Sequence, residues 1–190
     1  MKKVYIIHGW SGSPNEPLFK WLDAELNKAG FEVVVPEMPD TDHPKIETWV
    51  PFLKELIGIP NENIFFIGHS IGCQTILRFL ETLPDDVKIG GAVFIAGWYD
   101  VRNIETEEDN KIVAPWVNTP RDDEKIKRIV NRPVVILSDD DPFVALENKN
   151  SWEEKVGAKV LIEHNKGHFT EEDGVTSLPS ALESLLKISN

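Results

Sequence analysis

Six short apolar runs, rich in β-branched and aromatic residues, recur along the chain, and helical or turn segments separate them. Near-continuous apolar strands of this kind are typical of parallel sheets that are covered on both faces. The alternation predicts an α/β fold with a six-stranded, mostly parallel sheet and helices on both sides. The six expected strands are KVYIIHG, FEVVVP, NIFFIG, GGAVFIAGW, PVVILS and AKVLIE.

Helical spacing of apolar residues marks most of the intervening segments. Pro17 suits the first turn of one helix, and Gly30 suits the cap that ends it. Pro51 should lie near the first turn of its helix or at a kink. The stretch from Tyr99 to Pro120 lacks clear periodicity, so no helix is predicted there. The expected helices are Pro17–Ala29, Ile46–Ile57, Ile71–Leu83, DDEKIKRIV, a segment around Ala145–Val156, and Thr176–Ile188.

Length, charge and cysteine content restrict the kind of protein. The 190 residues suit a single α/β domain, residues 1–190, with a continuous core. A net charge of −12 disfavours nucleic acid phosphates and anionic lipid surfaces as partners. Cys73 is the only cysteine, and neither a signal-peptide core nor a membrane-spanning stretch is recognisable. A cytoplasmic protein is therefore expected.

The residues Gly68-His69-Ser70-Ile71-Gly72 form a G-x-S-x-G pattern between an expected strand and an expected helix. The glycines leave room for a turn so sharp that the Ser70 side chain projects above the sheet. Because Ile71 opens the helix, its N–H is free to face a developing oxyanion. A second N–H donor is expected from Trp10, in the loop HGWSGSP after the first strand. The pattern predicts Ser70 as a nucleophile.

A nucleophilic serine needs an acid, and ligands of such sheets bind beyond the carboxyl ends of the strands. Asp139, Asp140 and Asp141 directly follow the fifth expected strand. Asp141 precedes Pro142, which fixes the local backbone and can hold the carboxylate still, so it is the predicted acid. Asp100, after the fourth strand, is the alternative acid.

The base should follow the sixth strand, where His164 and His168 lie. His164 is close to the strand end and is expected to be structural or exposed, whereas His168 follows Gly167 in a loop, as a mobile base would. A metal site made by these two histidines is disfavoured, because the residues between them do not suit a helix. The order Ser70, Asp141, His168 is the one expected of α/β-hydrolases.

The segments HGWSGSP, GHSIG, SDDDPF and KGHF together resemble the small α/β-hydrolases of the retinoblastoma-binding protein 9 family. The resemblance extends from Val4 to the last helix. It implies a serine hydrolase with Ser70, Asp141 and His168 as its catalytic triad, no cofactor and a minimal lid.

The substrate is less constrained than the chemistry. The expected substrate is a small molecule with an acyl group, as an ester, thioester or amide. Trp98, Tyr99 and Trp116 could form an aromatic wall over it, although tryptophans more often serve packing. The alternative is a binding or regulatory protein that retains the fold without using the chemistry.

Overall fold

The computed structural model describes all 190 residues and contains one sheet of six strands. The strand order is β2-β1-β3-β4-β5-β6, and every neighbouring pair is parallel. The α/β-hydrolase-type sheet expected from the sequence is confirmed, with all pairs rather than most of them parallel. The strands are β1 (Lys3–Ile7), β2 (Glu32–Val34), β3 (Ile64–His69), β4 (Gly91–Ile95), β5 (Val134–Ser138) and β6 (Lys159–Glu163).

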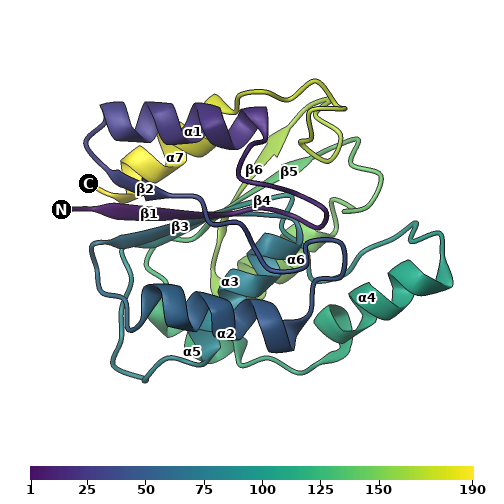
Figure 1. Cartoon of the computed structure of the whole chain (residues 1–190), viewed down its shortest axis with the longest axis horizontal. Helices are drawn as coiled ribbons and strands as arrows, with labels where there is room; N and C mark the ends of the chain where they lie inside the picture. Colours follow the sequence, from purple (N-terminus) through teal and green to yellow (C-terminus); the bar gives the residue numbers. More distant parts are fainter.

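Seven helices accompany the sheet, and Figure 1 shows α1 and α7 on one face with α2, α3, α5 and α6 on the other. The first two contribute to an apolar cluster with one side of the strands, and the others contribute to a second cluster on the opposite side. The helices are α1 (Pro17–Lys28), α2 (Ile46–Ile57), α3 (Ile71–Glu81), α4 (Glu107–Asn118), α5 (Asp123–Ile129), α6 (Asn148–Val156) and α7 (Pro179–Ile188).

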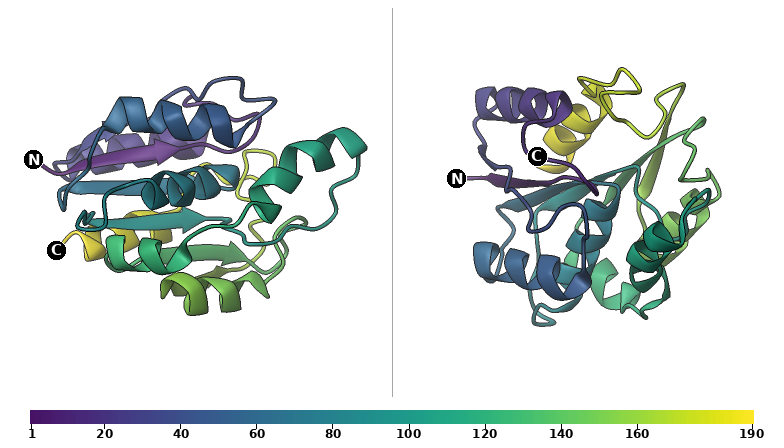
Figure 2. Two further views of the ribbon diagram at one scale, coloured as in Figure 1. Left: turned by 90° about the horizontal axis from the view of Figure 1, so that it is seen from below. Right: turned by 45° about the vertical axis from the view of Figure 1, so that its right-hand side comes forward.

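Helix α4 corrects the sequence interpretation, which placed no helix between Tyr99 and Pro120. Thr106 caps it by accepting a hydrogen bond from the N–H of Asp109 at 3.0 Å, and its first turn is acidic. Both features stabilise a helix N-terminus. Apolar periodicity is weak because α4 projects beyond the strand ends (Figure 2) and buries only Val113 and Trp116.

Two smaller differences between the expected and the observed helices concern prolines. Pro51 lies inside α2, beyond its first turn. Helix α7 begins at Pro179 rather than Thr176, with Leu178 as its N-cap residue. Proline supplies a suitable φ at the start of a helix but no N–H, which accounts for the later start of α7. None of the helices has the length and apolar character that crossing a bilayer requires.

The strand order reverses between β1 and β3, which are neighbours although β2 lies between them in sequence. Chains leaving these two strands depart toward opposite faces, so a crevice opens beyond their carboxyl ends. The loop from His8 to Glu16 and the Ser70 turn leave the sheet at this point. A ligand-binding site is therefore expected at that edge of the sheet.

Candidate active site

Ser70 lies between β3 and α3 in a strained backbone conformation. Its φ of 51° and ψ of −120° are rare for a residue with a side chain. A Cβ on Gly72 would lie 2.3 Å from the carbonyl oxygen of Ile7, and one on Gly68 would lie 2.9 Å from the Cys73 backbone. Only glycine at both positions lets the chain turn this sharply against β1, which is the reason for the pattern around the serine.

Ser70, His168 and Asp141 form one continuous chain of hydrogen bonds. The Ser70 Oγ is 2.9 Å from His168 Nε2, and His168 Nδ1 is 2.8 Å from Asp141 Oδ2. With the imidazole proton on Nδ1, His168 donates to the carboxylate and accepts from the hydroxyl. The residues come from the ends of β3, β5 and β6, 98 positions apart at the widest, so only the fold brings them together.

The Asp141 carboxylate is buried and held by several donors. Its Oδ1 accepts hydrogen bonds from the N–H groups of Phe143 at 2.8 Å and Val144 at 3.0 Å, while the residue is 1% exposed. The alternative acid, Asp100, is exposed, and its carboxylate accepts only from the N–H of Val101. Asp141, and not Asp100, therefore fixes the orientation of the His168 ring.

The other histidines have different surroundings. His164 is exposed, as expected, and pairs with Asp139. His69, the residue before the serine, is buried with its ring centroid 5.2 Å from that of His168. Burial, followed by the nearby His168, lowers the pKa of His69 to about 4, so this imidazole is neutral at physiological pH. His43 lies in an exposed pair with Asp40.

Two backbone N–H groups lie beside Ser70 without acceptors of their own. The N–H of Trp10 makes no hydrogen bond within the protein, although that of the next residue, Ser11, donates to the Thr41 carbonyl at 2.8 Å. Ile71 is the first residue of α3, so no helical carbonyl precedes its N–H by one turn. Trp10 and Ile71 both line the same cleft as Ser70.

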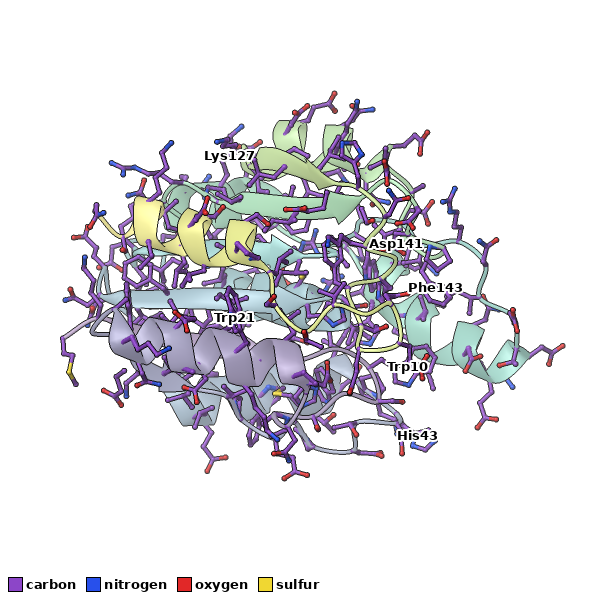
Figure 3. All side chains as sticks on the ribbon, turned by 90° about the horizontal axis from the view of Figure 1, so that it is seen from above. Trp10, Trp21, His43, Lys127, Asp141 and Phe143 are labelled. Carbon is purple, nitrogen blue, oxygen red and sulfur yellow. The ribbon has the colours of Figure 1, made fainter.

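That cleft has a volume of about 740 Å³ and opens onto Ser70 and His168. Figure 3 shows Trp10, Asp141 and Phe143 gathered beyond the strand ends. Trp98 lines the cleft, as expected, but Tyr99 and Trp116 do not. Trp116 is buried against Trp49. The Tyr99 ring instead lies near the cations of Arg121 and Lys155, outside the cleft and contrary to the expectation.

The remaining lining was not foreseen from the sequence. Its apolar part includes Phe143, whose ring centroid lies 5.3 Å from that of His168 in an edge-to-face arrangement. Its polar part is strongly acidic and includes no lysine or arginine. The apolar additions are Val101, Ile104, Val113 and Phe143, and the acidic ones are Glu16, Glu105, Asp109, Glu171 and Glu172. The SDDDPF segment held the only sequence signal, since Phe143 follows the predicted acid by two positions.

The sheet topology and the serine turn define the α/β-hydrolase fold. Comparison with known proteins then gives the family: residues 4–187 match the serine hydrolase family, so the chain belongs to it and is a hydrolase. The resemblance inferred from the sequence is thereby confirmed at the level of serine hydrolases.

Individual relatives agree with this assignment. The protein YdeN of Bacillus subtilis is 31% identical over 178 residues, which cover 94% of this chain and 91% of YdeN. The crystal structure of YdeN superposes with a TM-score of 0.89 over 99% of this chain and 98% of the other, at 29% identity. The serine hydrolase RBBP9 of Rattus norvegicus is more distant, at 24% identity over 85% of this chain and 78% of RBBP9.

Proposed function

We propose that this protein hydrolyses small carboxylic esters, thioesters or amides through an acyl-enzyme formed on Ser70. The observation that carries the proposal is the hydrogen-bonded chain from Ser70 through His168 to the buried Asp141, which opens onto a cleft. The same three groups perform acyl transfer on several unrelated folds. Membership of the serine hydrolase family supports this reading.

In the first half of the reaction, Ser70 Oγ attacks the acyl carbonyl carbon while His168 Nε2 takes its proton. Asp141 stabilises the resulting imidazolium and keeps Nδ1 protonated. The carbonyl oxygen becomes an oxyanion, which the N–H groups of Trp10 and Ile71 are positioned to bind. His168 then returns the proton to the leaving oxygen, sulfur or nitrogen as its bond to carbon breaks, which leaves the acyl group on Ser70.

In the second half, His168 removes a proton from water, and the hydroxide attacks the acyl carbon. The ester bond to Ser70 breaks, the serine recovers its proton from His168, and the carboxylic acid departs. The two proton transfers that involve Ser70 cross the 2.9 Å contact between Nε2 and Oγ, and the other two take place between Nε2 and the leaving group or water. These reaction steps use no metal or organic cofactor.

A fluorophosphonate probe tests the proposal directly, since it phosphonylates only serines that a neighbouring base activates. We expect stoichiometric labelling, located at Ser70 by peptide mass spectrometry, together with turnover of p-nitrophenyl butyrate. A folded protein that neither labels nor hydrolyses would favour the alternative, a binding protein that retains the hydrolase fold.

The charge of the cleft leads to a prediction about substrates. Five carboxylates line it without a lysine or arginine, and low-dielectric walls strengthen their combined field. Among p-nitrophenyl esters with acyl chains of equal length, we expect a chain ending in ammonium to exceed one ending in carboxylate in kcat/KM by about 10-fold or more. The ratio should shrink at 0.5 M salt, because ions screen exposed charges.

The double variant Glu171→Gln and Glu172→Gln is the matched control for this measurement. It preserves side-chain size while removing two of the negative charges, so the ratio between the two esters should fall. Equal rates for both esters in wild type at low salt would contradict the argument from charge.

A further inference from the structure

The loop that carries His168 is attached to a neighbouring loop through its own backbone. Gly167 donates its N–H to Asp140 Oδ1 at 2.8 Å, and Lys166 donates its N–H to Ser138 Oγ at 3.0 Å. The Ser138 hydroxyl in turn donates to the same Asp140 oxygen at 2.6 Å. Asp140 thus holds two successive amides, one of them directly and the other through a hydroxyl, immediately before His168.

On the other side of the loop, His69 holds the carbonyl of His168 itself. Its Nε2–H donates to that oxygen at 2.8 Å, and the side chain is buried. Because His69 is neutral, it carries one N–H, and it adds no positive charge beside the imidazolium that His168 becomes during acyl transfer. The ring centroid of Phe19 lies 6.1 Å from that of His69 in a tilted arrangement.

The turn between these two attachments is tight. Gly167 has a φ of 51°, and a Cβ there would lie 2.2 Å from the Asp173 carboxylate. That carboxylate accepts the N–H of His168 at 2.8 Å. The N–H of Gly167 and both the N–H and the carbonyl of His168 therefore each have a side-chain partner, which is the arrangement of a rigid support.

We propose that Asp140 and His69 are positioning residues, which fix the backbone on the two sides of His168 so that Nε2 stays within reach of Ser70. The inference rests on the proposed function and deepens it. Neither residue exchanges a proton with substrate. A displacement of the loop by about 1 Å would carry the 2.9 Å contact beyond hydrogen-bonding range, and misplacement of that size costs about 100-fold in rate.

Asp140 offers the cleaner experiment because it is exposed and does not line the cleft. For Asp140→Ala we expect kcat on p-nitrophenyl butyrate to fall by about 10- to 100-fold, with KM within about twofold of wild type. Asp140→Asn keeps an oxygen that accepts both hydrogen bonds and should recover most of kcat. Asp122→Ala removes a comparable carboxylate cap on α5, remote from the cleft, and should leave kcat unchanged.

His69 gives the second pair of variants. His69→Gln can place an amide N–H where Nε2 lies, whereas His69→Phe fills the space without a donor. We expect the phenylalanine variant to lose kcat by about 10-fold or more and the glutamine variant to lose much less. If His69→Phe does not fold, the Asp140 series still decides.

A readout independent of activity separates this inference from the proposed function. Hydrogen exchange of the Lys166 and Gly167 amides, followed by NMR, should accelerate in Asp140→Ala but not in Asp122→Ala. Unchanged exchange, or accelerated exchange with wild-type kcat, would overturn the positioning role. If wild type itself proves inactive, the proposed function fails, and amide exchange alone decides whether Asp140 fixes the loop.

Discussion

Replacing Ser70 with alanine is expected to lower kcat/KM for ester hydrolysis by roughly 10⁵-fold, which leaves only the residual rate that oxyanion binding and substrate binding supply. The substitution removes the Oγ that lies 2.9 Å from His168 Nε2, so the imidazole has no hydroxyl to deprotonate. The turn itself should persist, because alanine and serine differ by one oxygen and share the same backbone preferences. The measurements are kcat/KM on p-nitrophenyl butyrate, the presteady-state burst, and fluorophosphonate labelling.

A suitable control is Ser151→Ala, on α6 outside the cleft, which should keep wild-type kinetics. Circular dichroism and the thermal midpoint would establish that Ser70→Ala is folded. Turnover near the wild-type rate in a folded Ser70→Ala protein would mean that another group attacks the substrate or that a base activates water directly. Either result would exclude the acyl-enzyme described above.

The sheet was predictable because its four inner strands, β1, β3, β4 and β5, are buried on both faces and therefore leave a strong apolar signal. Val134 to Leu137 in β5, for example, lie between β4 and β6 with almost no exposure, and their sequence allows little else. Helix α4 was not predictable by the same criterion, because it projects from the body and buries one narrow stripe. The Thr106 cap and the acidic first turn that follows it were the available signals, and they are local rather than periodic.

In the candidate site, too, some residues could be predicted from the sequence and others could not. Residues at strand ends could be found from sequence because the ends of parallel strands meet at one edge. The aromatic wall failed for Tyr99 and Trp116, since proximity to a strand end does not determine which side of the loop a ring faces. Asp140 and His69 illustrate a further limit. Their partners are backbone groups of a distant loop, and nothing in the order of residues records such contacts.

The second large effect concerns the acid. Asp141→Asn should lower kcat/KM by about 10⁴-fold, although the side chains have nearly the same size. The Asp141 carboxylate can only accept the proton on His168 Nδ1. An asparagine can turn its NH₂ toward Nδ1, which favours the tautomer with the proton on Nε2. That tautomer cannot accept a proton from Ser70, and the variant also loses the charge that stabilises the imidazolium.

Asp100→Asn is the decisive comparison, because Asp100 is the other aspartate at a neighbouring strand end. It is exposed and makes no contact with His168, so its variant should retain kcat/KM within about threefold, as surface substitutions usually do. A large loss in Asp100→Asn with retention in Asp141→Asn would reverse the assignment of the acid. Because Asp141 accepts from three donors in a buried position, its replacement should also lower the thermal midpoint. Kinetics therefore have to be measured well below that temperature, where the protein is fully folded and the loss reports the changed tautomer and charge rather than unfolding.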